Sequence, residues 1–278
     1  MPQNSERLFV DLLFRASRKY ANWDPEVPIQ VGDYGRITQG KPSWAFWRRG
    51  SGIFLKEGNI YEESIADEYK IPQPEEHGED SIEGATWITS KNARQVEGDL
   101  TVAGETPAFV QCKVKAAFTF NAGCGAILVM NDDTISSLRT PGKLSRLLYE
   151  QRIPKGSVIV SEVHRSASYA RYLSAKQSNS ITIGLAAEPA IPNTVSASTH
   201  FKWMHSSQAG NFKSKTSKSG KREFYPLFRL VSLVERQVST GFRGGLVQEE
   251  ELPDAEPPWL AMNAAESGDS EESDGLER

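Results

Sequence analysis

The strongest constraint on the fold is an alternating run at residues 109–121. Apolar side chains take every second position there, and glutamine, lysine, alanine and threonine fill the positions between them. The apolar face consists of Val110, Cys112, Val114, Ala116, Phe118 and Phe120. A period of two over a dozen residues is typical of a β-strand with one buried face. A glycine-rich bend at residues 123–125 and an apolar run at residues 126–130 predict a second strand, so the chain must build a sheet over a core.

The rest of the chain divides into further strands, a few helices and loops. Strands are predicted at residues 29–37, 52–61, 158–163, 181–187 and 194–203. Helices are predicted at residues 5–19, from residue 140 onward, at residues 168–176 and at residues 226–238. Residues 62–85 and 202–222 are predicted to be loops, the second of them flexible and basic. Together these segments predict an α+β fold with a twisted, mainly antiparallel sheet and peripheral helices.

The N-terminal helix, capped by Asn4 or Ser5, is predicted to have one apolar stripe and one basic side. Leu8, Leu12 and Ala16 follow one another at a four-residue step. The basic residues on the remaining surface are Arg7, Arg15, Arg18 and Lys19. Such a helix can lie on an anionic membrane, or it can pack on its own domain with the basic side in water. The helix alone leaves both interpretations open.

Residues 41–49 (KPSWAFWRR) bring three aromatic rings next to two arginines. The rings belong to Trp44, Phe46 and Trp47, and the guanidinium groups to Arg48 and Arg49. The proline before them and the glycines after them are typical of a turn between two strands. Tryptophan favours the boundary between lipid tails and headgroups, where a neighbouring arginine reaches phosphates. The alternative is an aromatic turn buried in the core, with the arginines in water.

The charges are divided unevenly along the chain. Residues 247–278 contain eleven acidic residues and one basic residue, whereas residues 1–246 contain 31 basic and 25 acidic residues. The first part therefore carries +6 and the last part −10, so the first part suits an anionic partner such as lipid or nucleic acid. The acidic end can cover that basic surface, or it can be a disordered, solubilising tail. Trp259 and Leu260 are its most promising apolar anchors.

Several classes of protein are disfavoured by the sequence. No run approaches eighteen apolar residues and the N-terminus has no apolar signal core, so we expect neither a transmembrane helix nor export. The two cysteines and four histidines have no metal-ligand spacing, so we expect no metal and no cofactor. We find no phosphate-binding glycine loop and no nucleophile–base pair, so an enzyme is not expected. A nucleic-acid-binding module with a masking tail is the main alternative, and a hydrolase with an unrecognised site is another.

The order of these elements resembles the gasdermin family of pore-forming proteins. In that family a basic N-terminal helix precedes a hairpin with an aromatic and basic tip, here residues 44–49, and a strand-rich body is closed by an inhibitory C-terminal part. The short C-terminal part is most similar to that of the fungal members. The large inhibitory domain of animal members is absent, so the acidic end has to supply the inhibition.

The resemblance implies a division of the chain and a mechanism. Residues 1–240 are expected to form a pore-forming domain with a gasdermin-like fold, and residues 241–278 a short acidic autoinhibitory segment anchored by Trp259. A protease, subtilisin-like in fungal relatives, is expected to cut the linker, and Phe242 is the expected residue before the scissile bond. The freed domain is then expected to bind acidic lipids through the basic helix and the aromatic loop.

The same resemblance implies the steps after lipid binding. The freed domain is expected to oligomerise and to refold two hairpin regions into a membrane β-barrel that kills the cell. Residues 109–121 and 194–203, with partners at residues 125–132 and 180–187, have the length and alternation that such strands need. The protein is accordingly expected in the cytoplasm when inactive and at the plasma membrane after activation, with no nucleic-acid partner.

Overall fold

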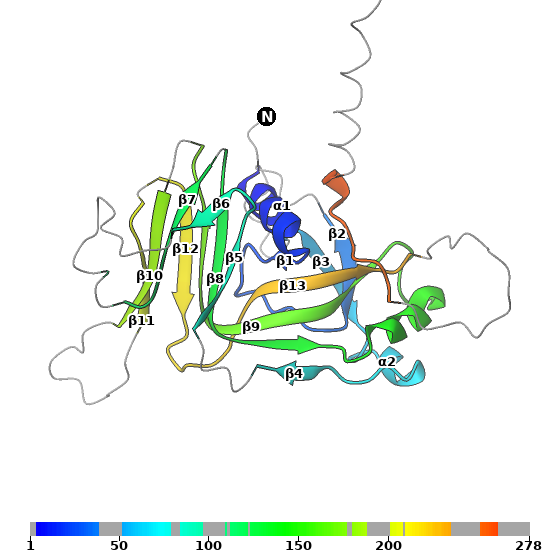
Figure 1. Cartoon of the computed structure of the whole chain (residues 1–278). Helices are drawn as coiled ribbons and strands as arrows, with labels where there is room; N and C mark the ends of the chain where they lie inside the picture. The colour runs from blue at the N-terminus through cyan, green and yellow to red at the C-terminus, as the bar shows by residue number, and fades with distance from the viewer. Residues whose placement is uncertain are drawn as a thin grey trace, which may run out of the picture.

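A computed structural model gives the fold of most of the chain (Figure 1). It describes residues 4–38, 52–78, 84–96, 109, 112–121, 123–176, 180–187, 201–207, 209–234 and 251–260. These residues form two sheets with antiparallel pairing and few helices, so the α+β class and the mainly antiparallel sheet predicted from the sequence are confirmed. The helices include α1 (Ser5–Ser17), α2 (Ile65–Glu68) and a 3-10 helix (Pro141–Tyr149).

The larger sheet has nine strands, which are arranged around the 16-residue strand β9 (Val158–Leu173). Its main path runs β1–β13–β9–β2–β3, β8 and β12 also pair with β9, and β4 and β5 pair with β8. The other strands are β1 (Tyr20–Ala21), β2 (Asp33–Ile37), β3 (Phe54–Asn59), β4 (Glu75–His77), β5 (Ala85–Thr89), β8 (Ala126–Ser137), β12 (Asn211–Thr216) and β13 (Phe224–Ser232). Figure 1 shows that β8 and β9 bend together along their length.

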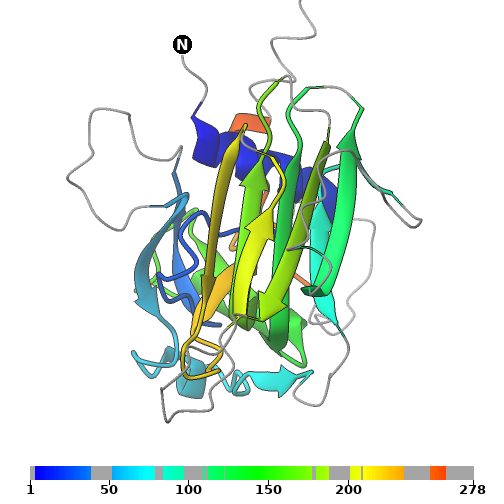
Figure 2. The same cartoon turned by 90° about the vertical axis from the view of Figure 1, so that its left-hand side faces the viewer.

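The smaller sheet covers one face of the larger one and forms a β-sandwich (Figure 2). Its strands, in spatial order, are β11 (Phe201–His205), β10 (Ser180–Ala187), β7 (Cys112–Phe120) and β6 (Ala93–Gln95). Phe118, Ile183 and Trp203 of this sheet pack against Val129 and Tyr172 of the larger one. On the opposite face of β8 lies α1, so this part of the molecule has three layers.

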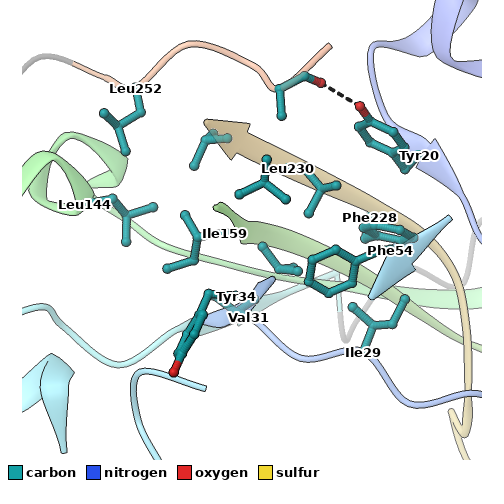
Figure 3. Close-up of a cluster of buried hydrophobic side chains, with 14 of the residues drawn as sticks. Tyr20, Ile29, Val31, Tyr34, Phe54, Leu144, Ile159, Phe228, Leu230 and Leu252 are labelled. Atoms are coloured by element: carbon teal, nitrogen blue, oxygen red, sulfur yellow. Dashed lines mark hydrogen bonds between the residues drawn. The ribbon is translucent and has the colours of Figure 1, made fainter. Parts of the chain in front are cut away.

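A second and larger core fills the other half of the molecule (Figure 3). It gathers side chains from β2, β3, β9, β13 and the 3-10 helix, including Tyr34, Phe54, Ile159 and Leu144. The C-terminal segment 251–260 contributes to the same core through Leu252 and its neighbours. The segment is therefore packed as part of the body of the molecule.

Several predicted elements are confirmed. The N-terminal helix begins after Asn4, whose side-chain oxygen accepts a hydrogen bond of 3.1 Å from the Glu6 N–H. β7 and β8 occupy the two strands predicted around the bend, and β10 the strand predicted at residues 181–187. The strands predicted on either side of the aromatic loop form the β2–β3 hairpin, although both are shorter than expected. Of the strand predicted at residues 194–203, the structure describes residues 201–203, which belong to β11.

Two predicted helices are wrong. Residues 168–173 belong to β9, and residues 224–232 form β13, which replaces the apolar helix expected at residues 226–238. Both strands are buried on both faces, so their sequences lack the alternation that marks a half-exposed strand. A short, continuous apolar run does not distinguish a buried strand from a buried helix. The helix expected from residue 140 is present as a 3-10 helix.

The two predicted loops also contain regular structure. Residues 62–85 include α2 and β4, and residues 202–222 include β11 and β12. β12 pairs with β9 over six residues, from Asn211 opposite Leu173 to Thr216 opposite Ser168. The prediction of a flexible basic loop at residues 202–222 is therefore wrong, because a sheet edge holds much of it.

Candidate functional site

The N-terminal helix α1 packs on its own domain through its apolar stripe. Phe9 and Leu13 are fully buried against Ala126 and Leu128 of β8. The helix ends at Ser17, and the left-handed backbone of the capping residue Arg18 (φ 59°) turns the chain toward β1.

Residues 251–260, here called the docked segment, pair alongside the end of β13 through backbone hydrogen bonds. The Ser232 N–H donates to the Pro253 carbonyl and the Ala255 N–H donates to the Leu230 carbonyl, both at 2.9 Å. Val231 and Asp254 form an antiparallel bridge between these two bonds. The docked segment thus occupies the edge of β13 next to the short strand β1.

Apolar side chains anchor the docked segment in the larger core. Leu252, Ala255 and Trp259 are buried, and Trp259 is only 1% exposed. Leu260 is half-buried and packs against the same core. Fully burying a tryptophan removes roughly 150–250 Å² from water, which is worth about 4–6 kcal/mol before the cost of ordering the segment. The structure thus places Trp259 and Leu260 against the body of the molecule.

Charged side chains frame the same contact. The Arg229 Nε donates to an Asp254 carboxylate oxygen at 2.7 Å, and Arg18 pairs with Glu256 at 3.2 Å. The Asp254 carboxylate raises the pKa of Arg229, and burial raises the pKa of Tyr20, whose hydroxyl lies under the segment. The guanidinium group of Arg7 lies 5.0 Å from the centre of the Trp259 ring, which is within cation–π range.

The four basic residues predicted on the N-terminal helix, of which Arg18 and Lys19 lie just beyond the end of α1, fall into three environments. Arg7 and Arg18 contact the docked segment, as just described. Arg15 pairs with Asp11 one turn earlier in the same helix at 3.2 Å, and its side chain is half exposed. Lys19 is ion-paired with Glu162 of β9. Each of these four described cations therefore has an acidic or aromatic partner within the chain.

The predicted aromatic loop and the predicted cleavage site lie outside the described residues. This applies to Trp44, Phe46, Trp47, Arg48, Arg49 and Phe242, and to the predicted domain boundary at residue 240. The hairpin that carries the aromatic loop is described up to both of its ends. Ile37 pairs with Phe54, and the Thr38 N–H donates to the Ile53 carbonyl at 2.6 Å, so residues 39–51 connect two paired strands.

Three of the six lysines and arginines at residues 202–222 are paired with acidic side chains. Lys213 pairs with Asp24 at 2.8 Å, Lys215 pairs with Glu26, and Arg222 pairs with Asp132 at 2.8 Å. The hydrogen bonds from these lysines hold the pKa of Glu26 below its ordinary value. This neutralisation weakens the case for a free phosphate-binding surface there.

The sequence did not reveal three further residues of this contact. Tyr20 and Arg229 of the body bind the docked segment, and Glu256 of the segment binds Arg18. Their partners lie more than 20 residues away, and neither periodicity nor spacing reveals such pairs. The lone charge of Arg229 inside an apolar run is the only local signal. Within the described part of the chain, no group of three or more histidine, cysteine or acidic side chains could hold a metal, and Cys112 and Cys124 form no disulfide. No described helix is long and apolar enough to cross a membrane.

Comparisons with known proteins do not extend these observations. No protein-family model, no curated protein and no solved structure matches this chain.

Proposed function

We propose that this chain is an autoinhibited pore-forming protein of the gasdermin type, whose C-terminal segment is removed by proteolysis. Cleavage between residues 237 and 248, with Phe242 as the expected residue before the scissile bond, would separate the docked segment from the body. The freed body would bind acidic lipids, oligomerise and permeabilise a membrane. The observation that carries the proposal is that the docked segment contacts two of the predicted lipid-binding cations, Arg7 and Arg18, while it completes the core through Trp259.

The physical basis for the trigger is the covalent tether. A tethered segment competes for its site at an effective concentration on the order of millimolar. A contact with a Kd of about 10 μM is then about 99% closed, yet it is mostly open once cut fragments are diluted to about 100 nM. Cleavage can therefore act as a switch without any change in the contacts themselves.

The proposal also explains the sign of the charges at the contact. Lysine and arginine near an anionic bilayer contribute about 1 kcal/mol each. Glu256 and the ring of Trp259 occupy Arg18 and Arg7 in the closed state, so lipid phosphates and the segment compete for the same groups. Removing the segment would therefore raise the affinity for acidic lipid.

The decisive experiment compares residues 1–242 with residues 1–278 in dye release from vesicles that contain acidic lipid. We expect release by the shorter chain alone. If both chains are folded and neither releases dye, the proposal fails. Tight, salt-dependent binding of the shorter chain to oligonucleotides without leakage would favour a nucleic-acid-binding module instead.

The aromatic loop provides a second test of the same function. Trp44→Ala combined with Trp47→Ala should abolish leakage by residues 1–242 and leave the unfolding transition unchanged, because rings at a membrane interface contribute nothing to the core. Loss of soluble protein would mean that these rings are core residues. Phe54→Ala is the matched control, since Phe54 is buried at the root of the same hairpin and its loss should destabilise the fold.

A further inference from the structure

A buried histidine lies at the point where α1 meets the large sheet. His164 of β9 is 4% exposed, and its ring contacts three charged side chains. Its Nδ1 lies 3.3 Å from a carboxylate oxygen of Asp133 on β8, and its Nε2 lies 3.1 Å from Glu162 and 2.9 Å from the Lys19 Nζ. Lys19 itself is bonded to the same Glu162 oxygen. The four side chains form one cluster.

The ring cannot satisfy all of these contacts in one protonation state. A neutral ring with its hydrogen on Nδ1 donates to Asp133 and accepts at Nε2 from the Lys19 ammonium. A protonated ring carries a hydrogen on both nitrogens, so Nε2 must donate and can bond only to Glu162. The ammonium group of Lys19 then faces a second donor of the same charge at 2.9 Å.

We propose that His164 is a proton-operated switch that holds Lys19 when the ring is neutral and releases it from the ring when the ring binds a proton. Lys19 directly follows the left-handed residue Arg18 and precedes β1, so its hold on β9 fixes the C-terminal end of α1. Release leaves Lys19 attached through Glu162 alone. Protonation therefore loosens the junction at Lys19, while the charged ring binds Asp133 and Glu162 more strongly and so adds to the stability of the sheet.

Charged side chains reach the ring or its partners from three neighbouring strands, β8, β9 and β13. β8 supplies Asp133, which also accepts a hydrogen bond of 2.8 Å from the Thr86 hydroxyl of β5. β9 supplies Glu162, and β13 places Arg229 opposite Glu162 in the sheet register. Arg229 is in turn paired with Asp254 of the docked segment. The two carboxylates that bond to the ring favour its charged form, and they hold the pKa of His164 above its ordinary value although burial opposes this.

The consequence for membranes rests on the proposed function. The surface potential of an anionic leaflet, about −30 mV, concentrates protons about threefold at its surface. Protonation of His164 would thus be favoured where acidic lipid is present, and a lipid phosphate would then compete with Glu162 alone for Lys19. The switch itself, however, is a property of the folded chain without lipid.

The test follows the His164 ring and the Lys19 side chain by NMR in the full chain from about pH 5 to about pH 9, without lipid. The signals of Lys19 next to its amine are expected to shift with the same midpoint as the ring. In His164→Gln, which does not titrate, the shift should disappear. His205→Gln is the matched control, because His205 stacks on Phe212 in the sandwich, and it should keep the wild-type profile.

A second variant keeps the inference testable if His164→Gln fails to fold. Lys19→Met removes the competing donor and positive charge, so the midpoint of the His164 ring should rise by about one pH unit or more. An unchanged midpoint in Lys19→Met, or a Lys19 signal that does not follow the ring in the wild type, would overturn the switch. Because no lipid is used, either result is independent of whether the protein forms pores.

Discussion

The Tyr20 hydroxyl donates a hydrogen bond of 2.7 Å to the Ala255 carbonyl, which joins β1 to a segment 235 residues further along the chain (Figure 3). The Tyr20 ring is 1% exposed and stacks on Phe228 with centroids 5.8 Å apart. The docked segment is therefore bonded to a side chain that belongs to the core. Changes at this contact should be felt both in the stability of the fold and in the retention of the segment.

Tyr20→Phe should lower the free energy of unfolding of the full chain by about 1–3 kcal/mol, because it leaves a buried carbonyl without its donor. Chemical denaturation provides the measurement. Tyr149→Phe removes the same atom from a side chain that is 74% exposed, and it should change stability by less than about 0.5 kcal/mol. Equal stability of the two variants would show that the hydrogen bond contributes nothing to the fold.

Trp259→Ala should cost about 3–5 kcal/mol, because it empties the largest fully buried side chain of the docked segment. Under the proposed function the uncut variant should also release dye from acidic vesicles without protease. Leu260→Ala, at a half-buried neighbouring position, serves as the control and should have a clearly smaller effect on both measurements. A folded Trp259→Ala chain that releases no dye from acidic vesicles would argue against autoinhibition by this segment.

The Arg229–Asp254 pair should contribute more than the Arg18–Glu256 pair. The side chains of the first pair are 34% and 30% exposed, whereas those of the second are 62% and 65% exposed. A double-mutant cycle with alanine should give a coupling of about 1 kcal/mol or more for the first pair and within about 0.5 kcal/mol for the second. Added salt should reduce the second coupling further. Couplings of equal size would mean that burial does not set the strength of these pairs.

Stability should depend on pH through the His164 cluster. Burial alone would lower the pKa of His164, but hydrogen bonds to Asp133 and Glu162 outweigh it and raise the pKa above 6.5. The group therefore stabilises the fold fully below pH 6.5, and this contribution is lost as the pH rises through the raised pKa. Burial would raise the pKa of Glu162, but hydrogen bonds from His164 and Lys19 lower it to about 2.

Glu162 acts in the opposite direction. Its contribution is present above pH 4.5 and is lost as the pH falls toward about 2. The cluster should thus stabilise the fold most between pH 4.5 and 6.5. Denaturation curves across pH should show this maximum in the wild type, and His164→Gln should lose the alkaline decline. Parallel profiles of the two chains above pH 6.5 would contradict the assignment.

The sequence predicted the parts of the fold where one face of an element meets water. β7 was found from its alternation, because exposed Lys113 and Lys115 separate its apolar residues. The helix α1 was found from its four-residue step and its cap. The strand predicted at residues 158–163 is the first part of β9, but the rest of β9 and the whole of β13 were missed, because both of their faces are covered and burial on two sides erases the pattern.

The candidate site was predicted only in part, for a related reason. Trp259 could be predicted as an anchor, since a tryptophan in an otherwise acidic and polar segment is more often buried than exposed. The pairing of Lys213 and Lys215 with acidic residues near position 25 could not, because it depends on how β12 folds back beside the N-terminal region. Charges that look free in a sequence are often neutralised by residues distant along the chain.

The backbone hydrogen bond between Ser232 and Pro253 brings the two ends of the connection between β13 and the docked segment close together, and residues 235–250 link these ends. A loop with adjacent ends tolerates changes in length, since each doubling costs only about 0.6 kcal/mol. Under the proposed function, the residues that the protease recognises are thus separate from the contacts of residues 251–260 that keep the protein inactive. The recognition sequence could be exchanged for that of an unrelated protease, which would make the same resting protein responsive to a different signal.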